Sequence, residues 1–142
     1  MNDLAVVVLN YNGKHLLPAC LASLVALTRP AEVVVADNGS TDSSLDDVRR
    51  NYPAVRTVDL GRNLGFAAGY NAALKCTEAT WLALVNNDAR LEPNWAATLL
   101  DWAADHPRAA LLGGKLLFEP KKPGDEPVLQ SAGASFTDAG TA

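Results

Sequence analysis

Short apolar runs alternate along the chain with segments whose apolar residues recur at helical spacing. The runs at 4–9 and 32–36 are rich in β-branched residues and predict strands that are buried on both faces, as in parallel sheets. A weaker run at 55–60 and the run at 81–85 predict two more strands. The intervening segments predict helices at 14–27, from the loop 37–42 through Val48, from Phe66 to Leu74, and from Pro93 to 104. Four strand–helix units in order predict an α/β fold with a mostly parallel central sheet and right-handed crossovers.

Further predictions concern burial and the C-terminal third of the chain. We expect short strands at 109–112, 115–118 and 128–136, separated by a polar insert at 119–127. Helical spacing predicts these inward-facing side chains: Leu17, Cys20, Leu21, Leu24, Val25, Phe66, Tyr70, Cys76, Trp95, Leu99, Leu100 and Ala103. A chain of 142 residues suits one domain, so residues 1–142 are expected to form a single domain.

Composition narrows the class of protein. The chain has 12 basic and 16 acidic side chains and a net charge of −4, which argues against a nucleic-acid partner. Two cysteines are too few for a disulfide framework. The longest N-terminal apolar run is too short for a signal peptide, and none approaches the about 18 apolar residues of a membrane span. A cytoplasmic location is therefore expected.

Polar residues gather where each predicted strand ends. The first strand is followed by Asn10 and Tyr11, the second by 37–40, the third by Arg62 and Asn63, and the fourth by 86–88. In open parallel sheets ligands bind beyond the carboxyl ends of the strands. The four clusters therefore predict a polar site along one edge of the sheet, although each cluster by itself also suits a turn or a helix cap.

Known phosphate-binding glycine motifs are missing from the sequence. There is no G-x-G-x-x-G after the first strand and no G-x-x-x-x-G-K-[ST]. A carboxylate at a strand end, Asp88, with neutral oxygen donors beside it suits Mg²⁺ or Mn²⁺, which would neutralise a diphosphate leaving group. Asp37 could accept the N3–H of a uracil or thymine base, which favours a pyrimidine without excluding guanine. Tyr11 could lie against the base and Arg62 could reach ribose or phosphate, but both residues equally suit an exposed surface.

The same clusters carry a resemblance to a known family. The segments are 6–12 (VVVLNYN), 33–42 (VVVADNGSTD), 63–71 (NLGFAAGYN) and 84–88 (LVNND). Together they resemble family 2 glycosyltransferases of the GT-A fold, and they are most similar to the rhamnosyltransferase-like subgroup. The resemblance covers 4–95 and, more loosely, 114–136. It implies a three-layer, Rossmann-like GT-A domain that is incomplete at its C-terminus.

The resemblance also implies a function. The donor would be a UDP- or dTDP-sugar, such as dTDP-rhamnose, and transfer would be inverting, onto a glycan or lipid-linked acceptor in cell-wall or polysaccharide biosynthesis. Peripheral association with the inner face of the cell membrane and homo-oligomerisation are left open. Carried over by position, the nucleotide-binding residues are Asn10, Tyr11, Asp37, Ser40, Asp42, Arg62, Gly65, Phe66, Asn71, Asn86 and Asn87. Asp88 is the metal ligand.

Two departures from the family pattern qualify these expectations. The D-x-D metal motif of the family reads Asn86-Asn87-Asp88 here, so Asp88 alone supplies charge and the metal site should be weakened. The catalytic base of the family lies further along, so we expect it beyond Ala142 and interpret the chain as the N-terminal, donor-binding part of a longer glycosyltransferase. We further expect the carboxylates of Asp37 and Asp88 to face one shared cleft.

Two alternative functions remain at this stage. One is a non-catalytic module that binds a nucleotide sugar without transferring it. The other is a sugar-phosphate nucleotidyltransferase, a class that needs a glycine-rich, basic phosphate loop directly after the first strand. The segment 10–13 with a lone Lys14 matches such a loop poorly.

Overall fold

The computed structural model describes residues 2–118 and 124–132. The chain divides into two compact units, Met1–Asp101 and Trp102–Ala142, and the helix α4 (Trp95–Asp105) runs across the division. The expectation that residues 1–142 form a single domain stays a prediction. Across the described residues no helix combines the length and apolar character needed to span a membrane.

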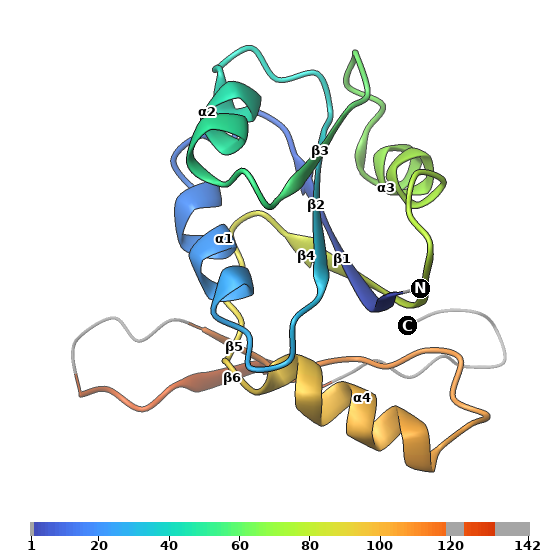
Figure 1. Cartoon of the computed structure of the whole chain (residues 1–142). Helices are drawn as coiled ribbons and strands as arrows, with labels where there is room; N and C mark the ends of the chain where they lie inside the picture. The colour runs from blue at the N-terminus through green and yellow to red at the C-terminus, as the bar shows by residue number, and fades with distance from the viewer. Residues whose placement is uncertain (1, 119–123, 133–142) are drawn as a thin grey trace, which may run out of the picture. The chain divides into compact units, whose positions relative to one another are not determined.

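The first unit is built on a four-stranded parallel sheet (Figure 1). Its strands are β1 (Asn2–Asn10), β2 (Glu32–Asp37), β3 (Arg56–Asp59) and β4 (Ala79–Asn86). The spatial order is β3-β2-β1-β4, and all three pairings are parallel. The chain moves outward from β1 to β3 and then returns to the other side of β1. The direction of winding therefore reverses between β1 and β4, which is where open α/β sheets bind ligands.

Helices lie on both faces of this sheet, although Leu82 (43% exposed) and Leu84 (53% exposed) leave one face of β4 uncovered. Figure 1 shows α1 (Leu17–Val25) and α2 (Ser44–Asn51) on one face and α3 (Phe66–Leu74) on the other. Because successive side chains of a strand point to opposite faces, β1 contributes to two cores. Val6 and Val8 pack with the α1–α2 side, whereas Val7 packs with Tyr70 and Ala73 of α3. The four predicted strands and the three-layer arrangement are confirmed.

The second unit contains an antiparallel pair of short strands, β5 (Leu116–Phe118) and β6 (Val128–Ser131). These strands confirm the predictions at 115–118 and at the start of 128–136. The remainder of that last segment from residue 133, and residues 119–123 of the polar insert, lie outside the described residues. The strand predicted at 109–112 does not form, because no described strand lies alongside this short segment to pair with it.

Three predictions of burial are wrong. Val25 is 63% exposed because it is the last residue of α1 and lies at the margin of the apolar stripe. Cys76 is exposed because α3 ends at Leu74, so helical spacing no longer applies to the cysteine. Phe66 is 67% exposed although Tyr70, one turn later, is buried. Phe66 is exposed because it is the first residue of α3, and this helix begins at the carboxyl edge of the sheet.

Candidate functional site

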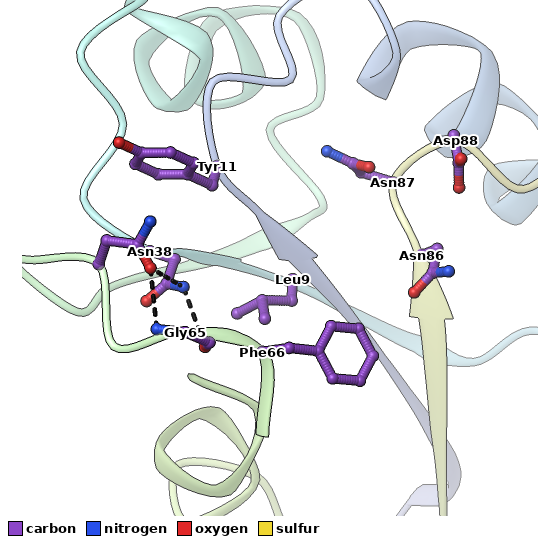
Figure 2. Close-up of a pocket in the computed structure, with 9 residues that line it drawn as sticks. Leu9, Tyr11, Asn38, Gly65, Phe66, Asn86, Asn87 and Asp88 are labelled. Carbon is purple, nitrogen blue, oxygen red and sulfur yellow. Dashed lines mark hydrogen bonds between the residues drawn. The ribbon is translucent and has the colours of Figure 1, made fainter. Parts of the chain in front are cut away.

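A pocket of about 410 Å³ opens at the carboxyl edge of the sheet (Figure 2). Its walls come from the ends of three strands, the loop after β3 and the first residue of α3. The lining residues are Leu9, Tyr11, Asn38, Asn63, Gly65, Phe66, Asn86, Asn87 and Asp88. Segments far apart in the sequence therefore meet in a pocket at the edge where the polar clusters predicted a site, and binding of a ligand there stays a prediction.

Six of the predicted site residues lie in the pocket wall: Tyr11, Gly65, Phe66, Asn86, Asn87 and Asp88. Tyr11 is 50% exposed and Phe66 67% exposed, so both aromatic rings are accessible to a ligand. Sequence reasoning missed Leu9, Asn38 and Asn63 as wall residues. Both asparagines stood inside the quoted motifs, and the signal that could have found them is their place directly after Asp37 and Arg62.

The loop after β3 is held in place by Asn38. Its Nδ2 donates to Asn63 Oδ1 at 3.1 Å and to the Gly65 carbonyl at 3.2 Å, while its Oδ1 accepts the Leu64 N–H at 2.8 Å. Asn63 Oδ1 also accepts the Gly65 N–H at 2.8 Å. The amide groups of Asn38 and Asn63 therefore build one wall of the pocket by fixing the backbone in front of α3.

Six other predicted residues do not line the pocket: Asn10, Asp37, Ser40, Asp42, Arg62 and Asn71. Asp37 is 3% exposed. Its Oδ1 accepts Asn10 Nδ2 at 3.0 Å and the Ser40 hydroxyl at 2.6 Å, and its Oδ2 accepts the Ser40 N–H at 2.8 Å. The Asp37 carboxylate turns toward these donors, so Asp88 lines the pocket and Asp37 does not. The expected shared cleft of the two carboxylates is not found, and contact of Asp37 with a base stays a prediction.

The remaining non-lining residues have other surroundings. Asp42 accepts the backbone N–H groups of Lys14 at 2.9 Å and Ser44 at 3.0 Å, which joins the start of α2 to the loop after β1. Burial by itself would raise the pKa of Asp42, but the hydrogen bonds from Ser44 and Lys14 hold it below its usual value. Arg62 and Asn71 are both exposed away from the pocket wall.

Asp88 and Asn86 form the polar end of the pocket. Both side chains are exposed, and Figure 2 shows them at the end of β4. Among the described residues no three His, Cys, Asp or Glu side chains gather as a metal site would require. One carboxylate and one amide oxygen suit a Mg²⁺ or Mn²⁺ ion whose remaining ligands are substrate phosphates and water. The donor set therefore fits a cation that arrives with a diphosphate.

Cys20 is no further metal ligand for this end of the pocket. Its Sγ lies 3.6 Å from the Asn86 carbonyl oxygen. Burial, with a smaller effect from the negative charge of Asp88, raises the pKa of the Cys20 thiol to about 11. Because the thiolate is the form that binds metals, a thiol that stays protonated near neutral pH is inert toward a cation.

A parallel sheet whose winding reverses beside a polar pocket at its carboxyl edge is typical of open α/β proteins that bind ligands at this edge. Within that class, the sequence model described as "Glycosyl transferase family 2" matches residues 5–137. The chain belongs to this family, and the resemblance noted from the sequence is confirmed.

Relatives with known names are glycosyltransferases. Over 122 residues the chain is 35% identical to an N-acetylglucosaminyl-diphospho-decaprenol L-rhamnosyltransferase of Mycobacterium tuberculosis, covering 78% of this chain and 40% of the relative. Over 95 residues it is 35% identical to a poly(ribitol-phosphate) beta-glucosyltransferase of Bacillus spizizenii, covering 60% of this chain and 14% of the relative. The chain thus spans well under half the length of these relatives.

Solved structures support the same conclusion. The chain superposes on S. aureus TarS 1–349 in complex with UDP-GlcNAc with a TM-score of 0.69 at 26% identity, covering 74% of this chain and 32% of TarS. It superposes on the mannosyltransferase PcManGT of Pyrobaculum calidifontis, in complex with GDP-Man and Mn²⁺, with a TM-score of 0.68 at 27% identity. That match covers 74% of this chain and 33% of PcManGT. The GT-A fold class is therefore confirmed.

Proposed function

We propose that this chain forms the donor-binding part of an inverting glycosyltransferase. The donor is a nucleotide-diphosphate sugar, and the acceptor is a hydroxyl group of a glycan or a lipid-linked sugar. One observation carries the proposal: an exposed tyrosine ring, a loop fixed by asparagine side chains and a single carboxylate line one pocket at the edge of the sheet. The relatives' names favour a role in cell-wall or polysaccharide biosynthesis, and the rhamnosyltransferase among them favours a rhamnosyl donor, which we propose to be dTDP-rhamnose, and a lipid-linked acceptor.

The nucleoside occupies the end of the pocket that holds Tyr11. A half-exposed tyrosine ring offers a face on which a base can stack, and such stacking is worth about 1–3 kcal/mol per base. UDP and dTDP are the proposed nucleotides, in keeping with the UDP-GlcNAc complex of TarS. The PcManGT complex with GDP-Man makes a guanine nucleotide the outcome that would correct this choice.

The diphosphate occupies the end of the pocket that holds Asn86 and Asp88. A divalent cation bound there would supply Lewis-acid stabilisation of the departing diphosphate. Asp88 provides the charge that attracts the cation, while neutral Asn86 adds an oxygen without charge. The affinity for the metal should therefore depend on the diphosphate being present. The proposal places the catalytic base, which deprotonates the acceptor, outside residues 1–142.

Nucleotidyl transfer finds no support in the described residues. That reaction needs a basic loop free to hold phosphates directly after β1. Lys14, the cation in that loop, has its Nζ 2.9 Å from Asp47 Oδ2 at the first turns of α2. The ammonium group is thus held against an acidic partner, and Lys14 does not line the pocket.

Isothermal titration calorimetry tests the proposal. UDP and dTDP should bind, and Mn²⁺ should raise their affinity about tenfold, the effect of one charge interaction of about 1.4 kcal/mol. Asp88→Asn should abolish the Mn²⁺ effect, whereas Asp46→Asn, which removes an exposed carboxylate on α2, should preserve it. Tyr11→Ala should weaken binding equally with and without metal.

Three results would overturn parts of the proposal. Tight binding of NAD or ATP in place of UDP and dTDP would remove the donor assignment. An Mn²⁺ effect that persists in Asp88→Asn would remove the metal assignment. Sugar transfer from a dTDP- or UDP-sugar by this chain alone would show that the base lies within residues 1–142. The chain would instead be a binding module if it binds nucleotide sugars but the longer protein that contains it transfers no sugar.

A further inference from the structure

The side chain of Asn10 is fully buried at the end of β1 and is surrounded by polar partners. Its Nδ2 faces three oxygens: Ser44 Oγ at 2.8 Å, Asp37 Oδ1 at 3.0 Å and Ser40 Oγ at 3.1 Å. Its Oδ1 accepts Asn87 Nδ2 at 3.1 Å. Because the Asp37 carboxylate can only accept, the amide of Asn10 has one orientation that satisfies all of these contacts.

The bond between Asn10 and Asn87 spans the line where the winding of the sheet reverses. Asn10 ends β1, and Asn87 directly follows β4. Asn87 is a wall residue of the pocket, whereas Asn10 is not. Behind this bond the network continues from Asn10 to Asp37 at the end of β2. One chain of hydrogen bonds therefore runs from Asp37 through Asn10 to Asn87, the residue directly before Asp88.

Gly13 supplies independent evidence that this contact is closely packed. A Cβ atom at Gly13 would lie 2.3 Å from Asn10 Oδ1 and 2.3 Å from Asn87 Nδ2. Both distances are far below van der Waals contact, so any side chain here would enter the hydrogen bond itself. Gly39, Gly61 and Gly65 have a positive φ, which favours glycine, but Gly13 does not. Glycine at position 13 is therefore needed for space rather than for backbone conformation.

From these contacts we infer that Asn10 is a positioning residue, which holds Asn87 and through it the turn that carries Asp88. Asp37 orients Asn10 from behind. The inference rests on the proposed function, because it assigns to this network the placement of the diphosphate-binding carboxylate relative to the nucleoside. Residues that orient metal ligands typically change metal affinity about 10–100-fold when they are lost.

The experiment combines calorimetry with ligand-free NMR on the whole chain. Gly13→Ala, Asn87→Ala and Asn10→Ala should each reduce the Mn²⁺ enhancement of UDP binding about tenfold. Gly13→Ala, which changes no residue of the pocket wall, should bind uridine, which has no diphosphate, within about twofold of the wild type. The double variant Asn10→Ala with Asn87→Ala should lose no more than the stronger single variant, because both remove the same hydrogen bond.

The NMR measurement needs no ligand. Gly13→Ala should shift the backbone amide resonances of Asn86, Asn87 and Asp88, whereas Gly113→Ala, which adds a methyl group in open space, should leave them unchanged. Ser23→Ala is the control for the loop itself. It removes the 3.1 Å bond from the Leu91 N–H to Ser23 Oγ in the loop after β4, away from the pocket, and should preserve the Mn²⁺ effect.

The outcomes distinguish a failure of the positioning role from a failure of the proposed function. If the wild type binds no UDP, the proposed function fails, and the NMR shifts alone decide the positioning role. If the wild type shows the Mn²⁺ effect and Gly13→Ala and Asn87→Ala keep it, the positioning role is overturned and the proposed function stands. Should Asn10→Ala fail to fold, the other two variants carry the test. Equal losses in Ser23→Ala would also overturn it, because they would indicate a general loosening of the loop.

Discussion

The hydroxyl group of Tyr70 offers a direct measure of how the sheet is held beneath the pocket. Tyr70 is 3% exposed on α3, and its hydroxyl donates to the Val85 carbonyl of β4 at 2.9 Å. The hydroxyl therefore joins α3 to β4, one of the strands that border the pocket. Tyr70→Phe removes a single oxygen atom and leaves the Val85 carbonyl without this donor.

The expected cost follows from that burial. A buried carbonyl that loses its donor costs about 1–3 kcal/mol in the free energy of unfolding. Tyr52→Phe is the matched control, because it removes the same atom from a 3.2 Å bond to the Pro18 carbonyl at an exposed site. Water replaces the hydroxyl there, so the control should cost less than about 0.5 kcal/mol.

Urea unfolding followed by far-UV circular dichroism provides the measurement. With m about 1–3 kcal/mol/M for a chain of this size, Tyr70→Phe should lower the midpoint by about 1 M at unchanged m, and the control should barely move it. Equal midpoints for the two variants would refute the reasoning. The hydroxyl at the β1–β4 boundary would then contribute no more than one in contact with water.

The same residue predicts a pH dependence. Burial raises the pKa of Tyr70 above its ordinary value of about 10, with the hydrogen bond to Leu9 opposing it in part. The folded state therefore holds the phenol proton more tightly than the unfolded state. The resulting stability is complete below about pH 10 and is lost as the pH rises through the raised pKa. Tyr70→Phe should reduce this alkaline loss and leave the part that comes from the buried Cys20 thiol, so an alkaline loss as large as that of the wild type would contradict the assignment.

Three further predictions address the fold. The raised pKa of the buried Cys20 thiol, about 11 against 9.0, should make stability fall as pH rises from about 9 to about 11, and urea midpoints of Cys20→Ala across that range should show a flatter slope. Gly39→Ala should cost more than Gly61→Ala in thermal unfolding. Both glycines have a positive φ, worth about 1–2 kcal/mol for a side chain, but only at Gly39 would the new Cβ lie 2.7 Å from backbone atoms. In urea, Leu21→Ala should cost about 2–5 kcal/mol and Val25→Ala less than about 0.5 kcal/mol, because Leu21 is fully buried and Val25 is 63% exposed.

Local pattern sufficed to predict the order of strands and helices and the edge of the sheet at which the pocket opens. A short β-branched run such as 4–9 favours a buried strand, and helical spacing favours a helix, so element type follows from neighbouring residues. Burial did not follow in the same way, because Leu82 and Leu84 of β4 are 43% and 53% exposed. The placement of a site followed from one topological rule, since parallel strands end at the same edge. Tyr11, Gly65 and the segment 86–88 were therefore located correctly without coordinates.

Which polar side chain at that edge faces the pocket could not be read in the same way. Asp37 and Asn38 are neighbours of similar size, yet Asp37 turns inward because Asn10 and Ser40 offer it donors, while Asn38 fixes the pocket wall. Ser40 is a local donor, 3 residues after Asp37, but Asn10 lies 27 residues before it. Long-range packing supplies the Asn10 donor, and a pattern of periods 2 and 3.6 contains no information about it. Only the folded chain, with β1 between β2 and β4, brings Asn10 and Asp37 together.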